Sequence, residues 1–236
     1  MGNNDPGLMT RFINLLKILR PHLICDIGSM DGGHSAFFRN ASPASRIIAF
    51  EANPYNYIAG VKAGRTAEYR VEWEHLAISD VDEVIAFNVL PHSKDISGDL
   101  WKKGGSSILH RQIGDFEEQS VLVPCRRLDS FLLERGLLHT GKALWIDVEG
   151  AADLVLKGAE EALKSTLMIH VEVESKQLFA GQALDKDIIA QLRSAGFTDI
   201  MSGNGGEDAQ YDVLLVSDKL LGMFSLEDVL ADKARP

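Results

Sequence analysis

Acidic side chains end two apolar runs of this sequence. Asp147 and Glu149 end one run, and Glu172 and Glu174 end another. Side chains alternate along a strand, so each pair shares one face of its strand. If both strands belong to one parallel sheet, the carboxylates meet at the edge where such sheets bind ligands. There they can act as a general base or hold a divalent cation, although some can instead face solvent or cap helices. We expect one or two of the four to be functional.

A glycine-rich turn and a further acid are spaced as in nucleoside-binding sheets. The pattern Asp-x-Gly-x-x-x-Gly-Gly begins at Asp26, and Glu51 ends a second apolar run about twenty residues after the turn. Such a turn lets the backbone approach a ligand, and the acid accepts hydrogen bonds from ribose hydroxyls. The glycines can be structural and Glu51 can cap the next helix, but the two together favour nucleoside binding. Because the spacing is not G-x-G-x-x-G, S-adenosylmethionine is favoured over a dinucleotide.

Two histidines are further candidates for proton transfer. His110 lies in a polar stretch, and His170 lies two residues before Glu172. Imidazole titrates near neutrality and can remove a proton from a hydroxyl, so His110 is a second candidate for the base. The alternative for each histidine is packing or exposure to solvent. The sequence contains no G-x-S-x-G elbow, Walker loop or H-E-x-x-H motif.

Composition excludes several classes of protein. The chain has 236 residues, 45% of them hydrophobic and 25% charged, and a formal net charge of −10. This length suits one large α/β domain. The acidic balance argues against nucleic acid as a partner, because that binding needs clustered Lys and Arg. No apolar run reaches the roughly 20 residues that span a bilayer. Two cysteines without a C-x-x-C motif and a start without signal-peptide features indicate a cytoplasmic protein with no membrane partner.

Strand and helix patterns alternate, which predicts a mainly parallel α/β sheet with right-handed crossovers. We expect helices over 8–20, 35–39, 54–62, 128–138, 153–163 and 185–195. We expect strands over 23–28, 46–51, 69–78, 84–89, 121–124, 143–150, 167–174, 198–201 and 211–216, the last two as an antiparallel hairpin. The prediction is a single domain over 1–236, with a leading helix in 1–20, an insertion or lid over 91–120 and a helical tail over 218–236.

In their order and spacing, several short pieces of the chain resemble the FkbM-like family of S-adenosylmethionine-dependent methyltransferases. The pieces are 26–32, 49–54, 76–80, 105–107, 123–129, 146–150 and 156–159. The resemblance implies one Rossmann-like class I methyltransferase domain, with a mainly parallel seven-stranded sheet, a terminal antiparallel hairpin and helices on both faces. The turn departs from the family pattern, because residues 28–31 read Gly-Ser-Met-Asp where relatives usually carry Gly-Ala-Asn.

The resemblance also implies contacts along the whole cofactor. They would come from Asp26, Gly28 and Ser29 at the methionine end, Glu51 at the ribose, Ala77 and Ile78 at the adenine and Asp147 near the sulfonium, with Asp31, Ala52 and Ser107 from the same matched pieces. Members of the family mostly methylate hydroxyl groups on sugars or natural products. The resemblance therefore implies O-methylation.

The sequence thus predicts an S-adenosylmethionine-dependent O-methyltransferase that acts on a hydroxyl of a sugar, glycan or natural-product acceptor. The base is expected among Asp147, Glu149, Glu172 and His110. A reaction without metal is slightly favoured, since the sequence does not show that the acids converge. If a divalent cation binds, its expected ligands are Asp147, Glu172 and Glu174.

Two other functions remain open at this stage. One is an NAD- or nucleotide-sugar-dependent oxidoreductase on a similar sheet, which the missing G-x-G-x-x-G spacing disfavours. The other is a non-catalytic cofactor-binding subunit. The oligomeric state is also open, a homodimer included.

Overall fold

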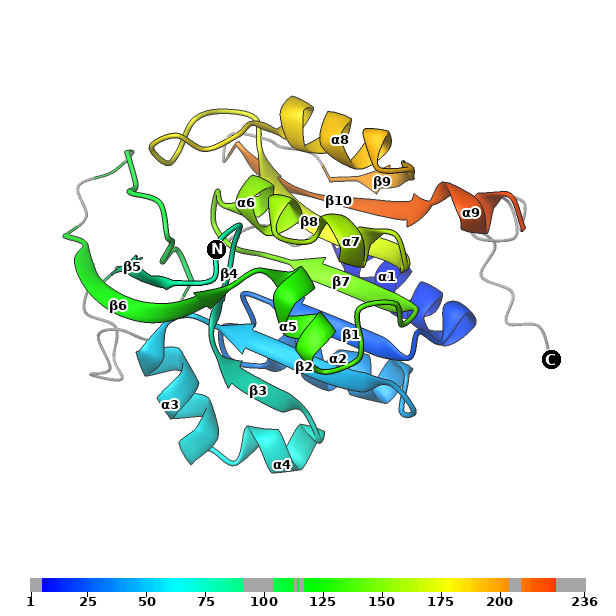
Figure 1. Cartoon of the computed structure of the whole chain (residues 1–236), viewed down its shortest axis with the longest axis horizontal. Coiled ribbons are helices and arrows are strands. Elements are labelled where there is room, and N and C mark those ends of the chain that lie inside the picture. Colours follow the sequence, from blue (N-terminus) through cyan, green and yellow to red (C-terminus); the bar gives the residue numbers. More distant parts are fainter. Residues whose placement is uncertain (1–5, 91–103, 113, 115–116, 204–208, 224–236) are drawn as a thin grey trace.

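A seven-stranded sheet forms the centre of the molecule, with helices on both faces. The computed structural model describes residues 6–90, 104–112, 114, 117–203 and 209–223. The strands of this sheet lie in the order β3-β2-β1-β7-β8-β10-β9. All neighbours pair in parallel except β10, which runs antiparallel to both β8 and β9 (Figure 1). The mainly parallel sheet and the terminal hairpin predicted from the sequence are both confirmed.

Short apolar runs rich in branched residues form the strands, and those in the middle of the sheet are buried on both faces. The main-sheet strands are β1 (Leu23–Ile27), β2 (Arg46–Glu51), β3 (Glu72–His75), β7 (Lys142–Ile146), β8 (Thr166–Glu174), β9 (Phe197–Ser202) and β10 (Gln210–Ser217). A second sheet has the order β4-β6-β5 and consists of β4 (Ala77–Ile78), β5 (Val84–Val89) and β6 (Gln119–Arg126).

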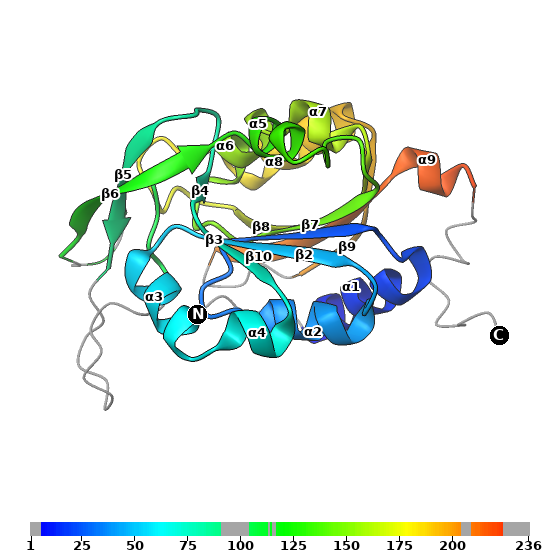
Figure 2. The same cartoon turned by 60° about the horizontal axis from the view of Figure 1, so that its bottom comes forward.

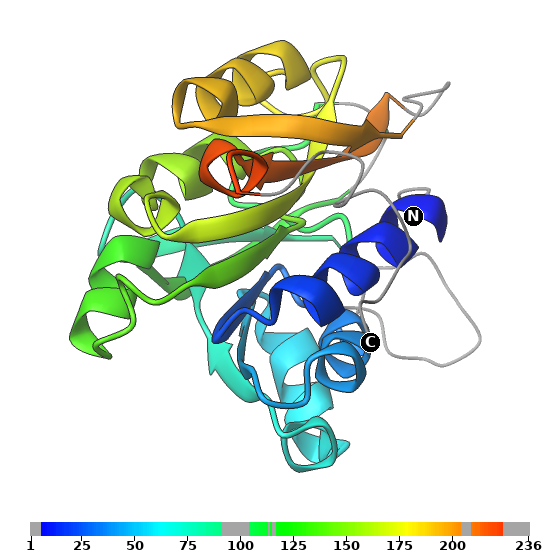
Figure 3. The same cartoon turned by 90° about the vertical axis from the view of Figure 1, so that its right-hand side faces the viewer.

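The helices form one layer on each face of the main sheet (Figure 2). One face carries α1 (Pro6–Leu19), α2 (Gly33–Ala41), α3 (Pro54–Lys62) and α4 (Arg65–Tyr69). The other face carries α5 (Leu128–Glu134), α6 (Ala152–Lys157), α7 (Glu160–Leu163) and α8 (Asp185–Ser194), and α9 (Asp218–Leu221) follows β10. Figure 3 shows α1 beside α2, and the two helices pack against each other. Each face has its own apolar core.

Several predicted elements are wrong in detail. The strand expected over 143–150 ends at Ile146, so Asp147 and Glu149 lie in the turn after it and do not share one face of a strand, and the helix expected over 128–138 ends at Glu134. The strand expected over 69–78 is instead the end of α4 followed by β3 and β4, which belong to different sheets. The helix expected over 153–163 is split into α6 and α7 at Gly158. A side chain at Gly158 would begin 1.9 Å from the carbonyl oxygen of Ser79. The close approach of these two backbones therefore requires glycine there, and the helix ends beside it.

Two predicted segments lie partly outside the described residues. Of the expected insertion, residues 91–103, 113, 115 and 116 are outside them, and so are residues 224–236 of the expected tail. Within the described part of the chain, every helix is too short or too polar to cross a membrane.

Candidate active site

The glycine turn after β1 is held against the end of β2. The backbone N–H groups of Gly28 and Ser29 both donate to the carbonyl oxygen of Phe50, at 3.0 and 2.9 Å. Gly28 has a φ of 84°, and a side chain there would begin 1.7 Å from the carbonyl oxygen of Asp147. Glycine is therefore required by the contact between this turn and the end of β7. The sequence argument explained the same glycine by the approach of a ligand.

Glu51, the last residue of β2, is surrounded by hydrogen-bond donors. Its Oε1 accepts from the backbone N–H of Asn53 at 2.7 Å, and the Met30 backbone N–H and the Asn56 side chain also bond to this carboxyl. Burial raises the pKa of Glu51 to about 8, and these hydrogen bonds only partly oppose the effect. A buried carboxylate among donors, at the carboxyl end of β2, is suited to accept hydrogen bonds from the hydroxyls of a ribose.

Asp26 lies within β1 and is fully buried. Its Oδ2 accepts a 2.5 Å hydrogen bond from the Ser35 hydroxyl, whereas its Oδ1 makes no hydrogen bond of standard geometry within the described residues. Loss of hydration raises the pKa of Asp26. A buried acceptor without a partner is costly, so this oxygen fits a cofactor that brings a donor, such as the ammonium of a bound methionine moiety.

The other residues expected at the cofactor have partners within the chain. Asp31 Oδ1 accepts from the Gly33 N–H at 2.9 Å, and Asp31 Oδ2 forms a 3.0 Å ion pair with Arg65. Ala77 and Ile78 form β4 and are buried beside β6. The remaining two are Ala52, whose carbonyl oxygen lies 3.2 Å from the His75 ring nitrogen, and Ser107, whose hydroxyl donates to the Glu149 carbonyl oxygen.

Carboxylates from the turn after β7 and from β8 meet on the face of the sheet that α1 and α2 cover. His170 of β8 packs against Phe12 of α1, so Glu172, two residues further along that strand, continues the same face. Asp147 lies just beyond the end of β7, at the start of the turn. Oxygens of Asp147, Glu149 and Glu172 all lie within 4.8 Å of one another. The convergence that the sequence left open is therefore present for three of the four predicted acids, and these oxygens are close enough to hold a divalent cation.

We call Asp147, Glu149 and Glu172 the acid group. Asp147 and Glu172 form a carboxyl pair within it. They share a hydrogen bond, which requires one of the two to hold a proton. Loss of hydration raises the pKa of Asp147 to about 8, and the negative charges of Glu149 and Asp212 add to the effect. Burial, and then the charge of Asp147, raise the pKa of Glu172. A carboxyl with its pKa raised toward neutrality is a better base at physiological pH.

Hydrogen bonds from the segment 104–107 hold Glu149 in place. Its Oε1 accepts from the Gly105 N–H at 2.8 Å, and its backbone carbonyl accepts from the Ser107 hydroxyl at 2.7 Å. Glu149 has a φ of 51°, which is unusual for a residue with a side chain. Strained backbone of this kind persists where surrounding contacts hold it, and it gathers at functional sites. The hydrogen bond from Ser107 therefore helps to hold Glu149 in this backbone conformation.

Glu174 differs from the other three acids because amide groups surround it. It accepts from the side-chain amides of Gln182 at 3.1 Å and Gln210 at 3.4 Å and from the backbone N–H of Gly150. Burial raises its pKa to about 7. Gln182 in turn accepts from two backbone N–H groups of the loop after β8. Glu174 thus ties that loop to the sheet, and it is not one of the three acids whose oxygens converge.

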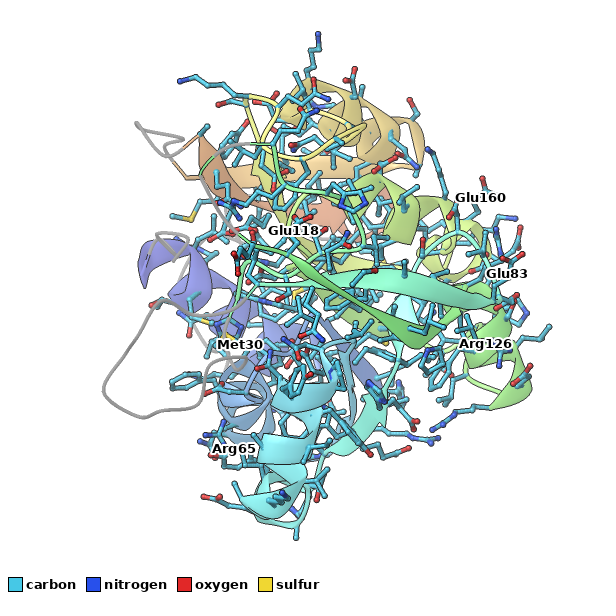
Figure 4. The ribbon with its side chains drawn as sticks, turned by 90° about the vertical axis from the view of Figure 1, so that its left-hand side faces the viewer. Met30, Arg65, Glu83, Glu118, Arg126 and Glu160 are labelled. Carbon is cyan, nitrogen blue, oxygen red and sulfur yellow. The ribbon has the colours of Figure 1, made fainter. Side chains whose placement is uncertain are left out.

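The two histidines lie in different surroundings. The His110 ring is 71% exposed and lies 2.8 Å from a carboxylate oxygen of Glu118. Figure 4 places Glu118 and Met30 toward the side of α1, opposite Glu83, Arg126 and Glu160. His170 is fully buried, and its ring stacks on Trp145 with centroids 3.4 Å apart. Burial lowers the pKa of His170, and Asp212, whose Oδ1 lies 3.4 Å from the ring Nε2, opposes this shift. His170 thus packs beneath the acid group and contacts Asp212.

Three neighbours of these acids were missed by sequence reasoning. Asn56 bonds to Glu51 from α3, Asp212 faces Glu172 from β10, and Gln210 reaches the acid group from the start of β10. Only the pairing of β10 with β8 brings the last two into place. The one available signal was a pair of polar residues two positions apart, Gln210 and Asp212, at the start of the hairpin strand.

The strand order, the glycine turn and the acid at the end of β2 define a Rossmann-like class I methyltransferase fold. Residues 26–198 match the methyltransferase FkbM domain family, and the chain belongs to that family. It is therefore an S-adenosylmethionine-dependent methyltransferase. This result confirms the resemblance read from the sequence and decides against the oxidoreductase alternative.

Two known proteins illustrate the relationship. The chain is 28% identical over 189 residues to the 2-O-methyltransferase NoeI of Sinorhizobium fredii, across 78% of this chain and 76% of the relative. A solved structure of the methyltransferase FkbM from Methylobacillus flagellatus superposes with a TM-score of 0.50 at 13% identity. That match covers 84% of this chain but only 44% of the solved one, so this chain spans less than half of that protein.

Proposed function

We propose that this protein methylates a hydroxyl group of a sugar, glycan or natural product, with the pair Asp147–Glu172 as the base. One observation carries the proposal: the pair directly adjoins the cofactor turn. The Asp147 N–H donates to the Ile27 carbonyl at 2.9 Å, and the Asp147 carbonyl faces Gly28. The name of the relative NoeI, a 2-O-methyltransferase, supports oxygen as the methyl acceptor.

Different residues near the turn would bind different parts of the cofactor. Asp26 and Ser29 would hold the methionine end of the cofactor, and Glu51 would accept from its ribose. Bound S-adenosylmethionine supplies a methyl group on a positively charged sulfur. Placing the acceptor hydroxyl in line with that group can lower the barrier by roughly 7–11 kcal/mol.

The acid group would accept the proton that the acceptor hydroxyl loses. Methyl transfer breaks a carbon–sulfur bond and forms a carbon–oxygen bond, and the hydroxyl proton passes to the ionised carboxylate of the pair. A hydroxyl is a poor nucleophile without such assistance. The alternative is that Asp147, Glu149 and Glu172 hold a divalent cation that lowers the pKa of the hydroxyl.

The acceptor class can be tested with paired substrates. Purified protein is incubated with methyl-labelled S-adenosylmethionine and either a methyl glycoside with a free 2-hydroxyl or its 2-deoxy analogue. We expect label only in the first, and equal label in both would contradict methylation of that oxygen. Parallel reactions with EDTA, and with magnesium added back, separate the two mechanisms. Transfer that survives EDTA supports the carboxyl pair, and transfer restored by magnesium supports a cation.

Cofactor binding is tested separately by calorimetry. Glu51→Gln replaces a carboxylate among donors with an amide whose NH₂ faces those donors, so we expect S-adenosylmethionine affinity to fall about tenfold or more. Glu68→Gln, on the exposed surface of α4, is the matched control. Unchanged affinity in Glu51→Gln would contradict the ribose assignment.

A further inference from the structure

Gln210 lies beside two carboxylates of the acid group and beside the carboxylate of Glu174. Its side-chain nitrogen is 3.2 Å from Glu149 Oε2, 3.4 Å from Glu172 Oε2 and 3.4 Å from Glu174 Oε1. An amide nitrogen carries two hydrogens, so three carboxylate oxygens share them. These acids come from the turn after β7 and from β8, and Gln210 comes from β10. One side chain therefore connects three parts of the site.

The backbone before Gln210 is fixed in place. Ala209 has a φ of 60°, and its carbonyl oxygen accepts from both the N–H and the hydroxyl of Ser175, at 2.8 and 3.2 Å. Ala209 is also buried against the apolar cluster that contains Leu178 and Phe179. Gln210 then pairs with Glu174 across the β8–β10 ladder. These contacts of Ala209 and the β8–β10 pairing therefore set the direction of the Gln210 amide.

The neutrality of this side chain matters because its neighbours are acidic. Asp212, two residues further along β10 on the same face, lies opposite Glu172. An acid at 210 would add another negative charge to a group that already repels itself. An apolar residue would remove the donor that three carboxylate oxygens share, which is costly for buried groups. An amide nitrogen draws the carboxylates together without adding charge.

We propose that Gln210 is a positioning residue, which holds Glu149 and Glu172 together so that the acceptor hydroxyl meets a preorganised acid group. This inference rests on the proposed function of that group. Gln210 acts through the two acids and takes no proton itself. Its removal should therefore lower the rate of transfer and leave cofactor binding intact.

The direct test is a pair of crystal structures, of the wild-type protein and of Gln210→Met. Methionine matches the length of glutamine and has no N–H donor. We expect the carboxylates of Glu149 and Glu172 to move apart in the variant. Unmoved side chains would overturn the inference. This measurement needs no acceptor, so it decides about Gln210 even if the wild-type protein transfers no methyl group to any hydroxyl, an outcome that would refute only the proposed function.

Kinetics supply the second test. We expect Gln210→Met to lower kcat about tenfold to a hundredfold while the Kd for S-adenosylmethionine stays within about twofold. Gln182→Met is the matched control, because Gln182 donates to Glu174 but to neither of the other two acids. A loss in Gln182→Met as large as that in Gln210→Met would overturn the inference.

A double-mutant cycle identifies the route of the effect. If Gln210 acts through Glu172, then Gln210→Met should change kcat little when Glu172→Gln is already present. Multiplying losses would show that Gln210 acts independently of that acid and would contradict the proposal.

Discussion

Glu51 and the pair Asp147–Glu172 are carboxyl groups at the same edge of one sheet, but their surroundings are opposite. Around Glu51 the neighbours are donors, namely two backbone N–H groups and the side chain of Asn56. Around the pair the neighbours include other acids, and the pair shares a hydrogen bond between carboxyls. Burial raises the pKa of all three groups, so burial alone does not distinguish them.

The difference separates binding from proton transfer. A carboxylate whose neighbours all donate is held in one position and is ready to accept from hydroxyls. A carboxyl beside another carboxyl must share a proton with it, and the proton can be exchanged when a substrate arrives. The same residue type therefore serves two purposes, according to what the neighbouring strands bring beside it.

The substitution Glu172→Gln should give the largest effect, and it tests whether proton transfer and cofactor binding are separate. The amide keeps the shape of the side chain but cannot accept a proton, so we expect kcat to fall by about 10²–10⁴-fold. The affinity for S-adenosylmethionine should stay within about threefold, because Glu51 lies on the other side of the turn. Stopped-time transfer assays and calorimetry measure the two quantities. Glu160→Gln on α7 is the control, an exposed acid on the opposite face.

Two results would contradict that expectation. Near-normal turnover in Glu172→Gln would move the base elsewhere in the group, with Asp147 the first choice. A large loss of cofactor affinity would mean that the acid group contributes to binding and that the two regions are not separate.

The contrast also explains what sequence could and could not predict. The position of Glu51 was predictable because it depends on local sequence: this residue ends an apolar strand, and the residues just after it cap α3, with the Asn53 side chain accepting from the Tyr55 N–H. The fold followed from the alternation of apolar strands and helices. The four predicted acids stand at the ends of apolar runs, so their place at the edge of the sheet was predictable from the sequence. The distances between their carboxylates were not.

Contacts across strands were out of reach of a single sequence. Gln210 meets Glu149 across 61 positions of sequence, and only the β8–β10 register sets that contact. The clamp of Ser107 on the Glu149 carbonyl spans 42 positions. Gly158 shows the same limit in the fold, because the backbone at Ser79 that excludes a side chain there belongs to a distant segment.

A second prediction concerns pH. The folded-state pKa values of Glu51 and Asp147 are about 8 and that of Glu174 is about 7, all above their ordinary values. Between the ordinary and the raised values the folded chain binds more protons than the unfolded chain, so stability falls as pH rises. We expect the Tm of the ligand-free protein to decrease from about pH 5.5 to 8.5.

Differential scanning fluorimetry of wild type and Glu172→Gln across this range provides the control. The variant cannot acquire a charge at that position, so its Tm should fall less steeply, and the advantage of the variant should grow with pH. Equal slopes in the two proteins would show that Glu172 is ionised in the folded protein throughout this range, so that its pKa is not raised. A wild-type Tm that rises with pH would show that the raised pKa values do not govern stability.

The smallest expected effect tests whether the cofactor side of the comparison extends to Asp31. Both oxygens of this residue already have partners in the chain, the Gly33 N–H at the start of α2 and the Arg65 guanidinium. Asp31→Ala should therefore act mainly on stability, by about 0.5–1.5 kcal/mol for the lost hydrogen bond from the Gly33 N–H, while the exposed ion pair adds at most about 1 kcal/mol. The Kd for S-adenosylmethionine should change by about threefold or less, which calorimetry measures beside the urea midpoint. Asp31→Asn keeps the acceptor for Gly33 and should recover most of the stability. A tenfold weaker Kd in both variants would instead place Asp31 at the cofactor, and the set of carboxylates that bind would then include one that is half exposed.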